Sequence, residues 1–324
     1  MNKHEESVSE QEAGMNASGR EARVWIGPAV PPAVVDAVIK AGGTRSASVD
    51  DANAIVWCGE GWEDASLKVL SDWLHPGIEW VQLDSAGVDD WFRLRIVDQA
   101  RVWTRADYGA AVAEQVLGFL IAACRRFPQF ARATEWDPVY GNTLADQTVG
   151  FIGAGRIVAE SILRLKPFGA RILTVSEPVA EIDGVEAAYG IKQLSEVLGS
   201  CDHVVVALPL TEQTRGLVNA KALGQMRSTA WLHNVGRGPV VDTDALVASL
   251  TRGQIAGACF DTTDPEPLPA DHPLWSFKNV LLTQHTANPE SGALAIYAET
   301  VRTNVTRFRE GAELLGIIEL ERGY

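Results

Sequence analysis

A glycine turn between two short apolar runs, within residues 148–178, constrains the fold of this chain more than any other stretch. Residues 148–152 predict a strand, a turn at 153–155 follows at once, and the amphipathic run 156–169 predicts a helix. A second apolar run then leads to an acid, Glu177. Backbone N–H groups at such a turn and at the start of a helix attract the pyrophosphate of a dinucleotide. The order of these elements therefore predicts a dinucleotide site.

The residue types around this turn also indicate which dinucleotide binds. Gly153 permits a tight turn, and Gly155 lets the backbone approach a pyrophosphate closely. Val158 stands where the pattern usually has a third glycine, so we expect the helix to lie slightly farther from the strand, with some loss of cofactor affinity. Glu177 is placed to bind the ribose hydroxyls and to repel a 2′-phosphate by roughly 1 to 4 kcal/mol. NAD(H) is therefore predicted in preference to NADP(H).

Length, charge and cysteine content narrow the class of protein. A chain of 324 residues is long enough for two domains. Its net charge of −14 argues against nucleic acid and anionic membranes as partners. The longest apolar stretch, 116–124, is too short to span a bilayer. The polar segment 1–20 predicts a disordered tail without a signal sequence. We therefore expect a cytoplasmic protein. The four cysteines are scattered along apolar runs, which predicts buried free thiols without a metal site.

Strands and helices alternate along most of the chain. Apolar strands that alternate with helices predict an α/β fold with a mainly parallel sheet covered on both faces, in which ligands bind at the carboxyl ends of the strands. Besides the central unit, we expect strands at 24–26, 54–57, 80–83, 102–104, 203–208, 230–234, 255–260 and 280–283, and helices at 31–41, 65–74, 110–127, 193–198, 243–252 and 291–309.

The predicted helix 110–127 differs from the others because nearly every position is apolar or small. Glu114 is one of its few polar residues. Such a helix is buried on more than one side, which predicts a place between domains or between subunits.

Three polar residues follow the ends of predicted strands on the same side as the glycine turn. They are Arg237, Glu266 and His285. An arginine in this position can hold a carboxylate or polarise a carbonyl, and a histidine can protonate the carbonyl oxygen as hydride arrives. Glu266 would favour the charged form of His285 and fix its ring. The set predicts hydride transfer to a carbonyl.

The other histidines and the tryptophans of the first half have structural interpretations. His233 lies within an apolar strand and is expected in the core, while His272 is expected to cap or terminate a loop. His75 and His203 lie at element ends without a suitable neighbourhood for catalysis. Trp57, Trp62 and Trp80 could narrow a substrate pocket or fill the core, and we favour the core.

These motifs together resemble the D-isomer-specific 2-hydroxyacid dehydrogenases, a family that includes phosphoglycerate dehydrogenase and glyoxylate/hydroxypyruvate reductase. The resemblance extends from about residue 81 to the C-terminus. Gln284 stands where the family usually has proline, which affects the loop before His285. The segments that carry the resemblance are 148–158, 208–211, 214–217, 234–242, 261–268 and 283–287.

The resemblance implies two Rossmann-like domains, with the cofactor domain inserted into a discontinuous substrate domain. It places the substrate domain at 21–107 and 286–324, the NAD-binding domain at 108–285, and a homodimer interface at the helix 110–127. It also implies that the backbone N–H groups of Ala86 and Gly87 bind the substrate carboxylate together with Arg237 and His285. The resemblance also implies contacts with the cofactor, and it places Asp261 at the nicotinamide carboxamide. Together with the glycine turn, the predicted cofactor-binding residues are Gly153, Ala154, Gly155, Arg156, Ile157, Glu177, Leu208, Pro209, Thr214, Val235 and Asp261.

The resemblance favours an NAD-dependent reductase of a small 2-oxo acid such as glyoxylate or hydroxypyruvate. Phosphoglycerate oxidation is the alternative among enzymes, but residues 85–89 hold no basic cluster for a phosphate, and the chain has no room for a C-terminal regulatory domain. Relatives that oxidise formate carry Gln at the position of Glu266, which disfavours that activity. An NAD-sensing binding protein, similar to relatives that act as corepressors, is the alternative from another class.

Overall fold

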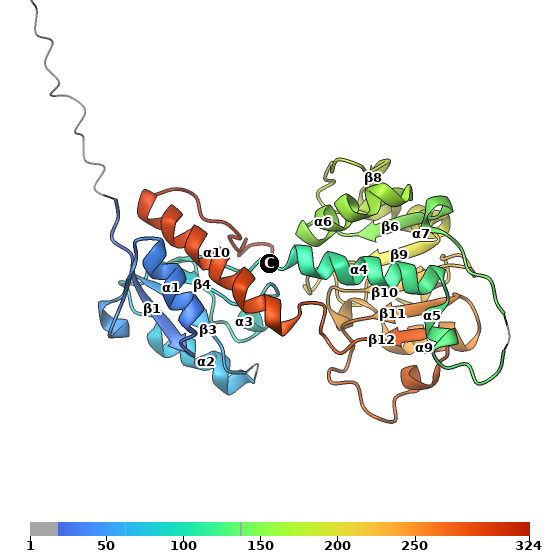
Figure 1. Cartoon of the computed structure of the whole chain (residues 1–324), viewed down its shortest axis with the longest axis horizontal. Helices are drawn as coiled ribbons and strands as arrows, with labels where there is room; N and C mark the ends of the chain where they lie inside the picture. Colours follow the sequence, from blue (N-terminus) through green and yellow to red (C-terminus); the bar gives the residue numbers. More distant parts are fainter. Residues whose placement is uncertain (1–18, 62, 137) are drawn as a thin grey trace, which may run out of the picture.

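The computed structural model describes residues 19–61, 63–136 and 138–324, which form two halves that each contain a parallel sheet (Figure 1). The two halves lie side by side, and the C-terminal end of the chain lies between them. The predicted tail at 1–20 falls outside the described residues except for its last two positions, and Trp62 falls outside them as well. The predicted α/β class with parallel sheets is confirmed.

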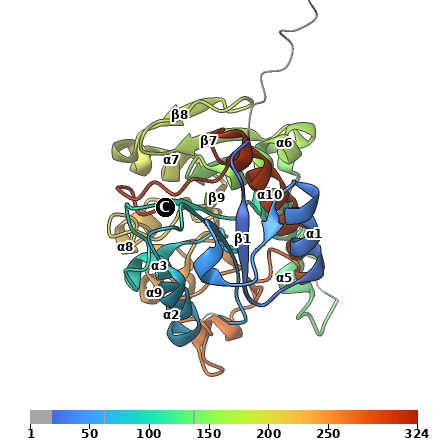
Figure 2. The same cartoon turned by 90° about the vertical axis from the view of Figure 1, so that its left-hand side faces the viewer.

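The first sheet has five parallel strands in the order β2-β1-β3-β4-β5. Figure 2 looks onto this half and shows α1 and α10 on one face of the sheet and α2 and α3 on the other. Every position of β3 is buried because both faces are covered. The elements are β1 Arg23–Pro28, α1 Pro32–Lys40, β2 Thr44–Arg45, β3 Ala54–Cys58, α2 Asp64–Trp73, β4 Trp80–Gln82, α3 Asp89–Arg93, β5 Val102–Thr104 and α10 Glu290–Glu310.

The helix α10 makes this half discontinuous in sequence, because it returns from the end of the chain to pack on α1. Val301 and Val305 of α10 are fully buried against Val34 and Val38 of α1 in one core cluster. The elements of the seven-stranded half therefore come between the two segments that form the five-stranded half, which confirms the expected insertion of one domain into the other.

The second sheet has seven parallel strands in the order β12-β11-β10-β9-β6-β7-β8. The chain runs from β6 outward to β7 and β8, then crosses to β9 on the other side of β6, so the strand order reverses between β6 and β9. Ligands bind at such a reversal in open α/β sheets. The elements are α4 Gly109–Cys124, α5 Phe127–Phe130, β6 Thr148–Ile152, α6 Arg156–Leu165, β7 Arg171–Val175, β8 Ala187–Tyr189, α7 Leu194–Ser200, β9 His203–Val206, α8 Ala220–Leu223, β10 Trp231–Asn234, α9 Thr243–Thr251, β11 Gly257–Phe260 and β12 Val280–Leu282.

The predicted helix 110–127 is wrong at its C-terminal end. The helix α4 ends at Cys124, and Arg126 then adopts the left-handed conformation with a φ of 56°. Pro128 follows in α5 and cannot donate the backbone hydrogen bond that a continuing helix requires. The predicted burial on more than one side is confirmed, since α4 packs on α6, β10 and β11.

The core contains the residues that the sequence analysis placed there. Trp57 and Trp80 are fully buried, and the indole N–H of Trp80 donates to Thr104 Oγ1 at 2.8 Å. The four cysteines are buried and free, as predicted. Across the described ranges, no group of histidines, cysteines and acids is arranged to hold a metal ion, and no helix is long and apolar enough to cross a membrane.

Two histidines form a polar pair inside the second half. His203 Nδ1 lies 3.0 Å from His233 Nε2, and His203 Nε2 lies 3.3 Å from Cys124 Sγ. Both rings are buried under α4, where His233 lies near Phe119. The expected core position of His233 is confirmed. Burial lowers the pKa of His203 to about 4, and burial together with His203 lowers the pKa of His233 well below its ordinary value.

We expect this pair to make the protein less stable in mild acid. Well above pH 6.5 both histidines are neutral in the folded and the unfolded chain, so they contribute no pH dependence there. Below pH 6.5 the unfolded chain takes up protons that the buried rings do not, and acidification to pH 5 should lower the free energy of unfolding by about 2 kcal/mol through His203 alone. Urea unfolding at pH 7 and pH 5 measures this loss.

Acidification from pH 7 to pH 5 lowers the free energy of unfolding of the wild type. In a double variant, His203→Gln with His233→Gln, this decrease should be smaller by at least 2 kcal/mol. The matched control is His272→Gln, because His272 caps the short turn Pro273–Ser276 through a hydrogen bond from Leu274 N and lies outside the buried pair. An equal decrease in the free energy of unfolding between pH 7 and pH 5 in the wild type and the double variant would contradict this account.

Candidate active site

The glycine turn lies at the carboxyl end of β6, where the order of the strands reverses. Gly153 has a φ of 122°, and a Cβ at this position would lie 2.6 Å from Ala207 O. Both facts restrict position 153 to glycine. Gly155 forms the N-cap of α6, and nothing lies within 4 Å of the place of its missing Cβ. The turn therefore leaves open space at the start of a helix, which fits the pyrophosphate of a dinucleotide.

The first turn of α6 packs tightly against the rest of its half. Val158 is fully buried in the same cluster as Phe151 and Val116, so its bulk is part of the core beneath the helix. Ile157 is partly buried beside it. The guanidinium of Arg156 pairs with Asp107 Oδ2 at 3.0 Å and is bound to Glu160 as well. A contact between the Arg156 side chain and a cofactor would therefore have to compete with two carboxylates.

The loop after β9 faces the same edge of the sheet. Thr214 Oγ1 donates to Pro209 O at 2.7 Å and accepts from Thr211 N at 2.8 Å, so this side chain closes the loop. A Cβ on Gly236 would lie 2.6 Å from Leu208 O, so this loop and the loop after β10 are in direct backbone contact. Glu177 lies exposed just beyond β7, on the other side of the glycine turn.

The loop after β10 presents Arg237 toward the five-stranded half. Val235 is buried, Asn234 Nδ2 donates to Arg237 O at 3.1 Å, and Gly236 N donates to Asn234 Oδ1 at 3.1 Å. A Cβ on Gly238 would lie 1.9 Å from Thr263 O, so the loop after β11 is packed directly against it. These contacts fix the backbone from which the arginine side chain extends.

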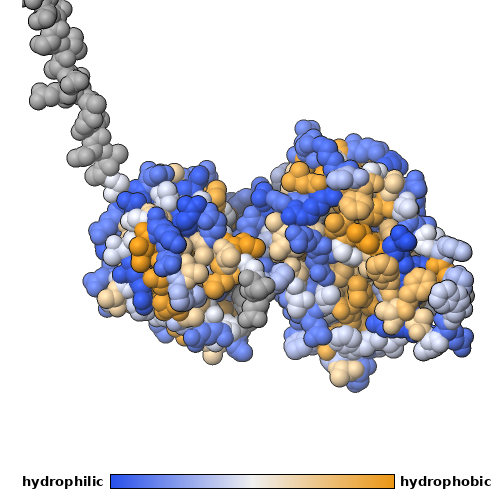
Figure 3. All heavy atoms as spheres, in the orientation of Figure 1, coloured by the Kyte–Doolittle hydropathy of each residue, from blue (hydrophilic) through white to orange (hydrophobic). Residues whose placement is uncertain are grey.

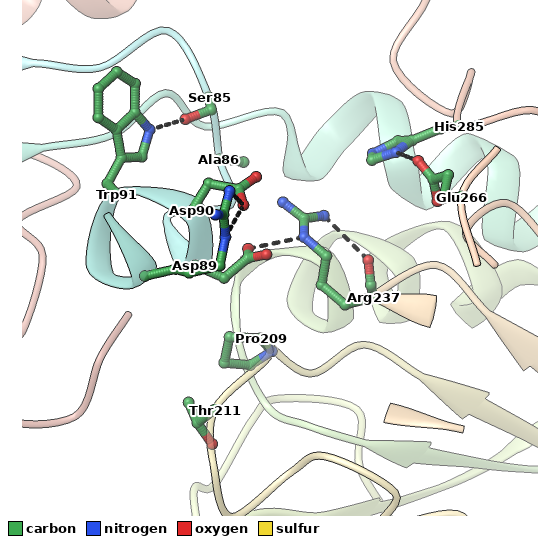
Figure 4. Close-up of polar contacts among 12 residues, drawn as sticks. Ser85, Ala86, Asp89, Asp90, Trp91, Pro209, Thr211, Arg237, Glu266 and His285 are labelled. Atoms are coloured by element: carbon green, nitrogen blue, oxygen red, sulfur yellow. Dashed lines mark hydrogen bonds and ion pairs between the residues drawn. The ribbon is translucent and has the colours of Figure 1, made fainter. Parts of the chain in front are cut away.

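Arg237 bridges the two halves. Its Nε donates to Asp89 Oδ1 at 3.0 Å, and Asp89 begins α3 in the five-stranded half. A Cβ on Gly87 would lie 1.3 Å from one terminal nitrogen of Arg237, so the guanidinium occupies the space that a side chain at position 87 would need. Figure 4 shows Arg237 between this loop and the imidazole of His285.

Glu266 and His285 form a hydrogen-bonded pair on the far side of Arg237 (Figure 4). His285 Nδ1 lies 2.6 Å from Glu266 Oε1, and Thr263 N donates to Glu266 Oε2 at 3.2 Å. Burial opposes ionisation of Glu266, but the hydrogen bond and charge of His285 outweigh it, so the pKa of Glu266 lies below its ordinary value. Because Nδ1 faces the carboxylate, Nε2 is the nitrogen that points away from Glu266.

The backbone at His285 is held in an uncommon conformation. Its φ is 54°, in the left-handed region that residues other than glycine rarely adopt. Asp261 is buried and holds this loop: its carbonyl accepts from His285 N at 2.7 Å, and its carboxylate accepts from Thr283 Oγ1 at 2.5 Å and from Thr286 N at 3.0 Å. Gln284, at the position of the family's proline, is exposed within the same loop.

The loop after β4 completes the site from the five-stranded half. Trp91 Nε1 donates to Ser85 Oγ at 3.4 Å, and Arg105 donates to Ala86 O at 3.0 Å. Among the described residues, the backbone N–H groups of Ala86 and Gly87 have no hydrogen-bond partner. They remain available for an anion. Burial lowers the pKa of Arg105, and the nearby Arg237 lowers it as well, so two guanidinium groups lie close to this loop.

A cavity of about 390 Å³ adjoins the Glu266–His285 pair in the seven-stranded half. Besides Asp261, Thr263, Glu266, Thr283, Gln284 and His285, the lining residues are Pro267, Leu268, Trp275 and Leu282.

Comparison with known proteins identifies the family. Residues 117–287, more than half of the chain, match the NAD binding domain of the D-isomer specific 2-hydroxyacid dehydrogenases. The chain belongs to this family. The resemblance noted from the sequence motifs is therefore confirmed.

The relatives of this chain include an uncharacterized protein, a reductase and a family member of known crystal structure. An uncharacterized protein of Corynebacterium melassecola is 34% identical over 297 residues, which cover 89% of this chain and 95% of that one. The glyoxylate reductase/hydroxypyruvate reductase of Homo sapiens is 38% identical over 68% of this chain and 67% of its own length. The crystal structure of a family member from Xanthobacter autotrophicus Py2, in complex with NADPH and MES, is 29% identical and has a TM-score of 0.81, covering 94% of this chain and all of that one.

The structure brings five of the predicted residues of the dehydrogenase site together. Arg237, His285 and Glu266 come from the seven-stranded half, and Ala86 and Gly87 come from the other. Sequence reasoning missed Asp89 and Arg105. Arg105 follows directly after β5, so the rule that ligands bind at the carboxyl ends of parallel strands could have found it. The pairing of Asp89 with an arginine 148 residues away has no signal in the sequence.

Proposed function

We propose that this protein reduces a small 2-oxo acid to a 2-hydroxy acid of D configuration, with a nicotinamide dinucleotide as the hydride donor. The observation that supports this proposal most strongly is the position of Arg237 between the Ala86–Gly87 loop and the His285–Glu266 pair (Figure 4). Glyoxylate and hydroxypyruvate are the first substrates to test, since they appear in the name of the human relative.

Each group has a task in this reaction. The N–H groups of Ala86 and Gly87 bind the substrate carboxylate, and Arg237 attracts the carboxylate and polarises the carbonyl oxygen. The bound dinucleotide supplies the hydride. His285 gives a proton from Nε2 to the carbonyl oxygen, while Glu266 holds Nδ1 and stabilises the positive charge of the ring before transfer.

The cofactor would bind to the seven-stranded half, which we assign to residues 108–285, with the substrate domain at 21–107 and 286–324. The open space at Gly155, the N-cap of α6, suits the pyrophosphate, and the exposed Glu177 suits the adenosine ribose. We propose NADH as the preferred form because Glu177 would repel a 2′-phosphate. The structural relative with NADPH shows that the family fold also accepts the phosphorylated cofactor.

Cofactor oxidation tests the proposal directly. The protein should oxidise NADH, and NADPH more slowly, when it is mixed with glyoxylate, hydroxypyruvate or pyruvate. Tight binding of NADH without turnover of any 2-oxo acid in a broad panel would contradict the proposal and favour an NAD-sensing protein.

Replacing Glu177 by Ala should narrow the preference for NADH. Loss of the carboxylate removes both the bonds to the ribose hydroxyls and the repulsion of a 2′-phosphate, so the ratio of kcat/KM for NADH to kcat/KM for NADPH should fall by about tenfold. The control is Glu181→Ala, because Glu181 is an exposed acid four residues farther along the same segment. An unchanged ratio in Glu177→Ala would argue against the ribose contact.

We also propose that the protein forms a homodimer through α4 and the segment that follows it. Several large apolar side chains lie exposed there, namely Phe127, Phe130, Trp136, Val139 and Tyr140, of which Trp136 is 97% exposed. Figure 3 shows hydrophobic residues gathered over the face of the seven-stranded half on which α4 lies. Large apolar side chains exposed along one segment are typical of a protein interface.

A charge in this surface should separate the subunits. Phe127→Asp together with Trp136→Asp should raise the dimer dissociation constant by at least a hundredfold, since buried aromatic residues dominate interface energies. Light scattering after size exclusion measures the mass. Ile39→Asp, in an exposed apolar position on α1, is the matched control and should leave the dimer intact. A wild-type protein that is monomeric at micromolar concentration would contradict the proposal.

A further inference from the structure

The loop after β4 is bonded to the segment that follows β5, the neighbouring parallel strand. The carbonyl of Ser85 accepts from Ala106 N at 3.1 Å. The carbonyl of Ala86 accepts from Nη1 of Arg105 at 3.0 Å. Two successive carbonyl groups of the loop are therefore held by two successive residues, the first through a backbone N–H and the second through the Arg105 side chain.

These two bonds decide where the free N–H groups of the loop point. Both peptide units are trans, and in a trans peptide the C=O and the N–H point in opposite directions. The N–H of Ala86 therefore points away from Ala106, and the N–H of Gly87 points away from the guanidinium of Arg105. Neither N–H has a hydrogen-bond partner in the part of the chain that the structure describes. Both donors are thus turned away from the segment after β5.

The backbone of Arg105 is itself held by the segment that follows α10. Its N–H donates to Gly316 O at 3.0 Å, and Ile318 N donates to Trp103 O at 2.9 Å. Gly316 has a φ of 71°, and a Cβ at this position would lie 2.7 Å from the carbonyl oxygen of Arg105. These close contacts fix the point from which the arginine side chain reaches the loop.

The charge of Arg105 acts on a neutral group. The residue is half-buried, and no carboxylate of the described residues forms an ion pair with it, although Asp107 and Glu319 attract it from farther away. A charged donor forms a stronger hydrogen bond with a carbonyl than a neutral donor does, and it polarises the whole peptide unit. The N–H of Gly87 belongs to this peptide unit, so it becomes a better donor to an anion.

We propose that Arg105 is a positioning residue for substrate binding, because its bond to Ala86 O directs the N–H groups of Ala86 and Gly87 toward the substrate carboxylate. Arg105 acts through the loop, whereas Arg237 contacts the substrate itself. Without the guanidinium, the peptide unit between residues 86 and 87 is free to turn, and its N–H loses its direction. This inference rests on the proposed function.

Binding of oxamate tests this role without turnover. Oxamate has the shape of pyruvate, but its amide carbonyl accepts no hydride from NADH. With saturating NADH, Arg105→Met should raise the dissociation constant of oxamate at least tenfold, because the donors are then free to turn away from the carboxylate. The dissociation constant of NADH should change by less than about threefold. Arg105→Gln gives the same test if Arg105→Met does not fold.

The matched control is Arg101→Met. Arg101 precedes β5, and its Nε donates to the carbonyl of Ile78, which precedes β4, at 3.4 Å. This arginine therefore holds a backbone carbonyl at the opposite end of the same two strands. The control should bind oxamate within about threefold of the wild type, and thermal unfolding shows whether each variant is folded.

A spectroscopic signature separates positioning from a general attraction of anions. In protein labelled with ¹⁵N-glycine, the amide signal that Gly87→Ala removes belongs to Gly87. Its proton should move downfield when oxamate binds to the wild type with NADH, and it should not move in Arg105→Met at saturating oxamate. In steady-state reduction of pyruvate by Arg105→Met, KM should rise at least tenfold while kcat falls less than about threefold, since the carboxylate is bound equally in the ground and transition states.

An oxamate affinity in Arg105→Met within threefold of the wild type would overturn the inference. Weaker binding with the Gly87 shift retained, or no binding of oxamate to the wild type, would overturn it as well. Binding of oxamate that depends on Arg105, in a protein that reduces no 2-oxo acid, would support the inference and contradict the proposed function. Turnover with an unchanged KM in Arg105→Met would do the reverse.

Discussion

Replacing His285 by Ala is expected to lower kcat for 2-oxo acid reduction by roughly a hundredfold or more, while NADH binding stays nearly unchanged. The imidazole is the group assigned to donate the proton, since Nδ1 is held by Glu266 at 2.6 Å and Nε2 points away from that carboxylate. Its loss leaves proton transfer to water. Steady-state NADH oxidation gives kcat, and the fluorescence of bound NADH gives the dissociation constant.

The control for this variant is His272→Ala, because His272 belongs to a neighbouring segment and caps a turn without touching the pair. It should retain nearly normal kcat. Near-normal turnover by His285→Ala would remove the role assigned to this residue, whatever the behaviour of the control.

Replacing Gly87 by Ala should abolish at least 99% of kcat/KM while the protein keeps its normal thermal stability. The new Cβ would lie 1.3 Å from a terminal nitrogen of Arg237, at the flexible end of that side chain. Arg237 can move aside without disturbing the fold, but it then leaves the position in which it binds the substrate. Displacement of a positioned charge by about an ångström costs on the order of a hundredfold in rate.

Gly118→Ala is the matched control, since nothing lies within 4 Å of the corresponding Cβ in α4. It should leave kcat/KM and thermal stability close to the wild-type values. A Gly87→Ala protein with full activity would show that Arg237 is not needed where the structure places it. A Gly87→Ala protein that unfolds at a much lower temperature would contradict the expected independence of site and fold.

Much of the fold could be predicted because its strands are short apolar runs between clear turn residues. The central unit illustrates this, since β6 is buried at every position and Gly153 ends it with a positive φ. Two of the four edge strands, β2 and β8, were not predicted. β2 has two residues, both exposed, and β8 has three, so neither has an apolar pattern of its own, and each exists because a neighbouring strand offers free backbone groups.

The candidate site could be predicted where a residue follows a strand end, which is the case for Arg237 and His285. Contacts between the two halves could not be predicted, because no local pattern in the sequence records them. The ion pair of Asp89 with Arg237 depends on how two separate sheets face each other. The carboxylate of Asp261 binds the loop of His285, and no local pattern records this contact. Its contact with the nicotinamide carboxamide stays a prediction.

Transfer of deuterium tests the central claim, which is that these residues carry a hydride from a dinucleotide to the carbonyl carbon of a 2-oxo acid. NADH carrying deuterium at C4 is incubated with the protein and hydroxypyruvate, and the product is examined by mass spectrometry and chiral chromatography. The account predicts a 2-hydroxy acid of D configuration with deuterium on carbon 2. A product without deuterium, or no product despite bound NADH, would contradict it.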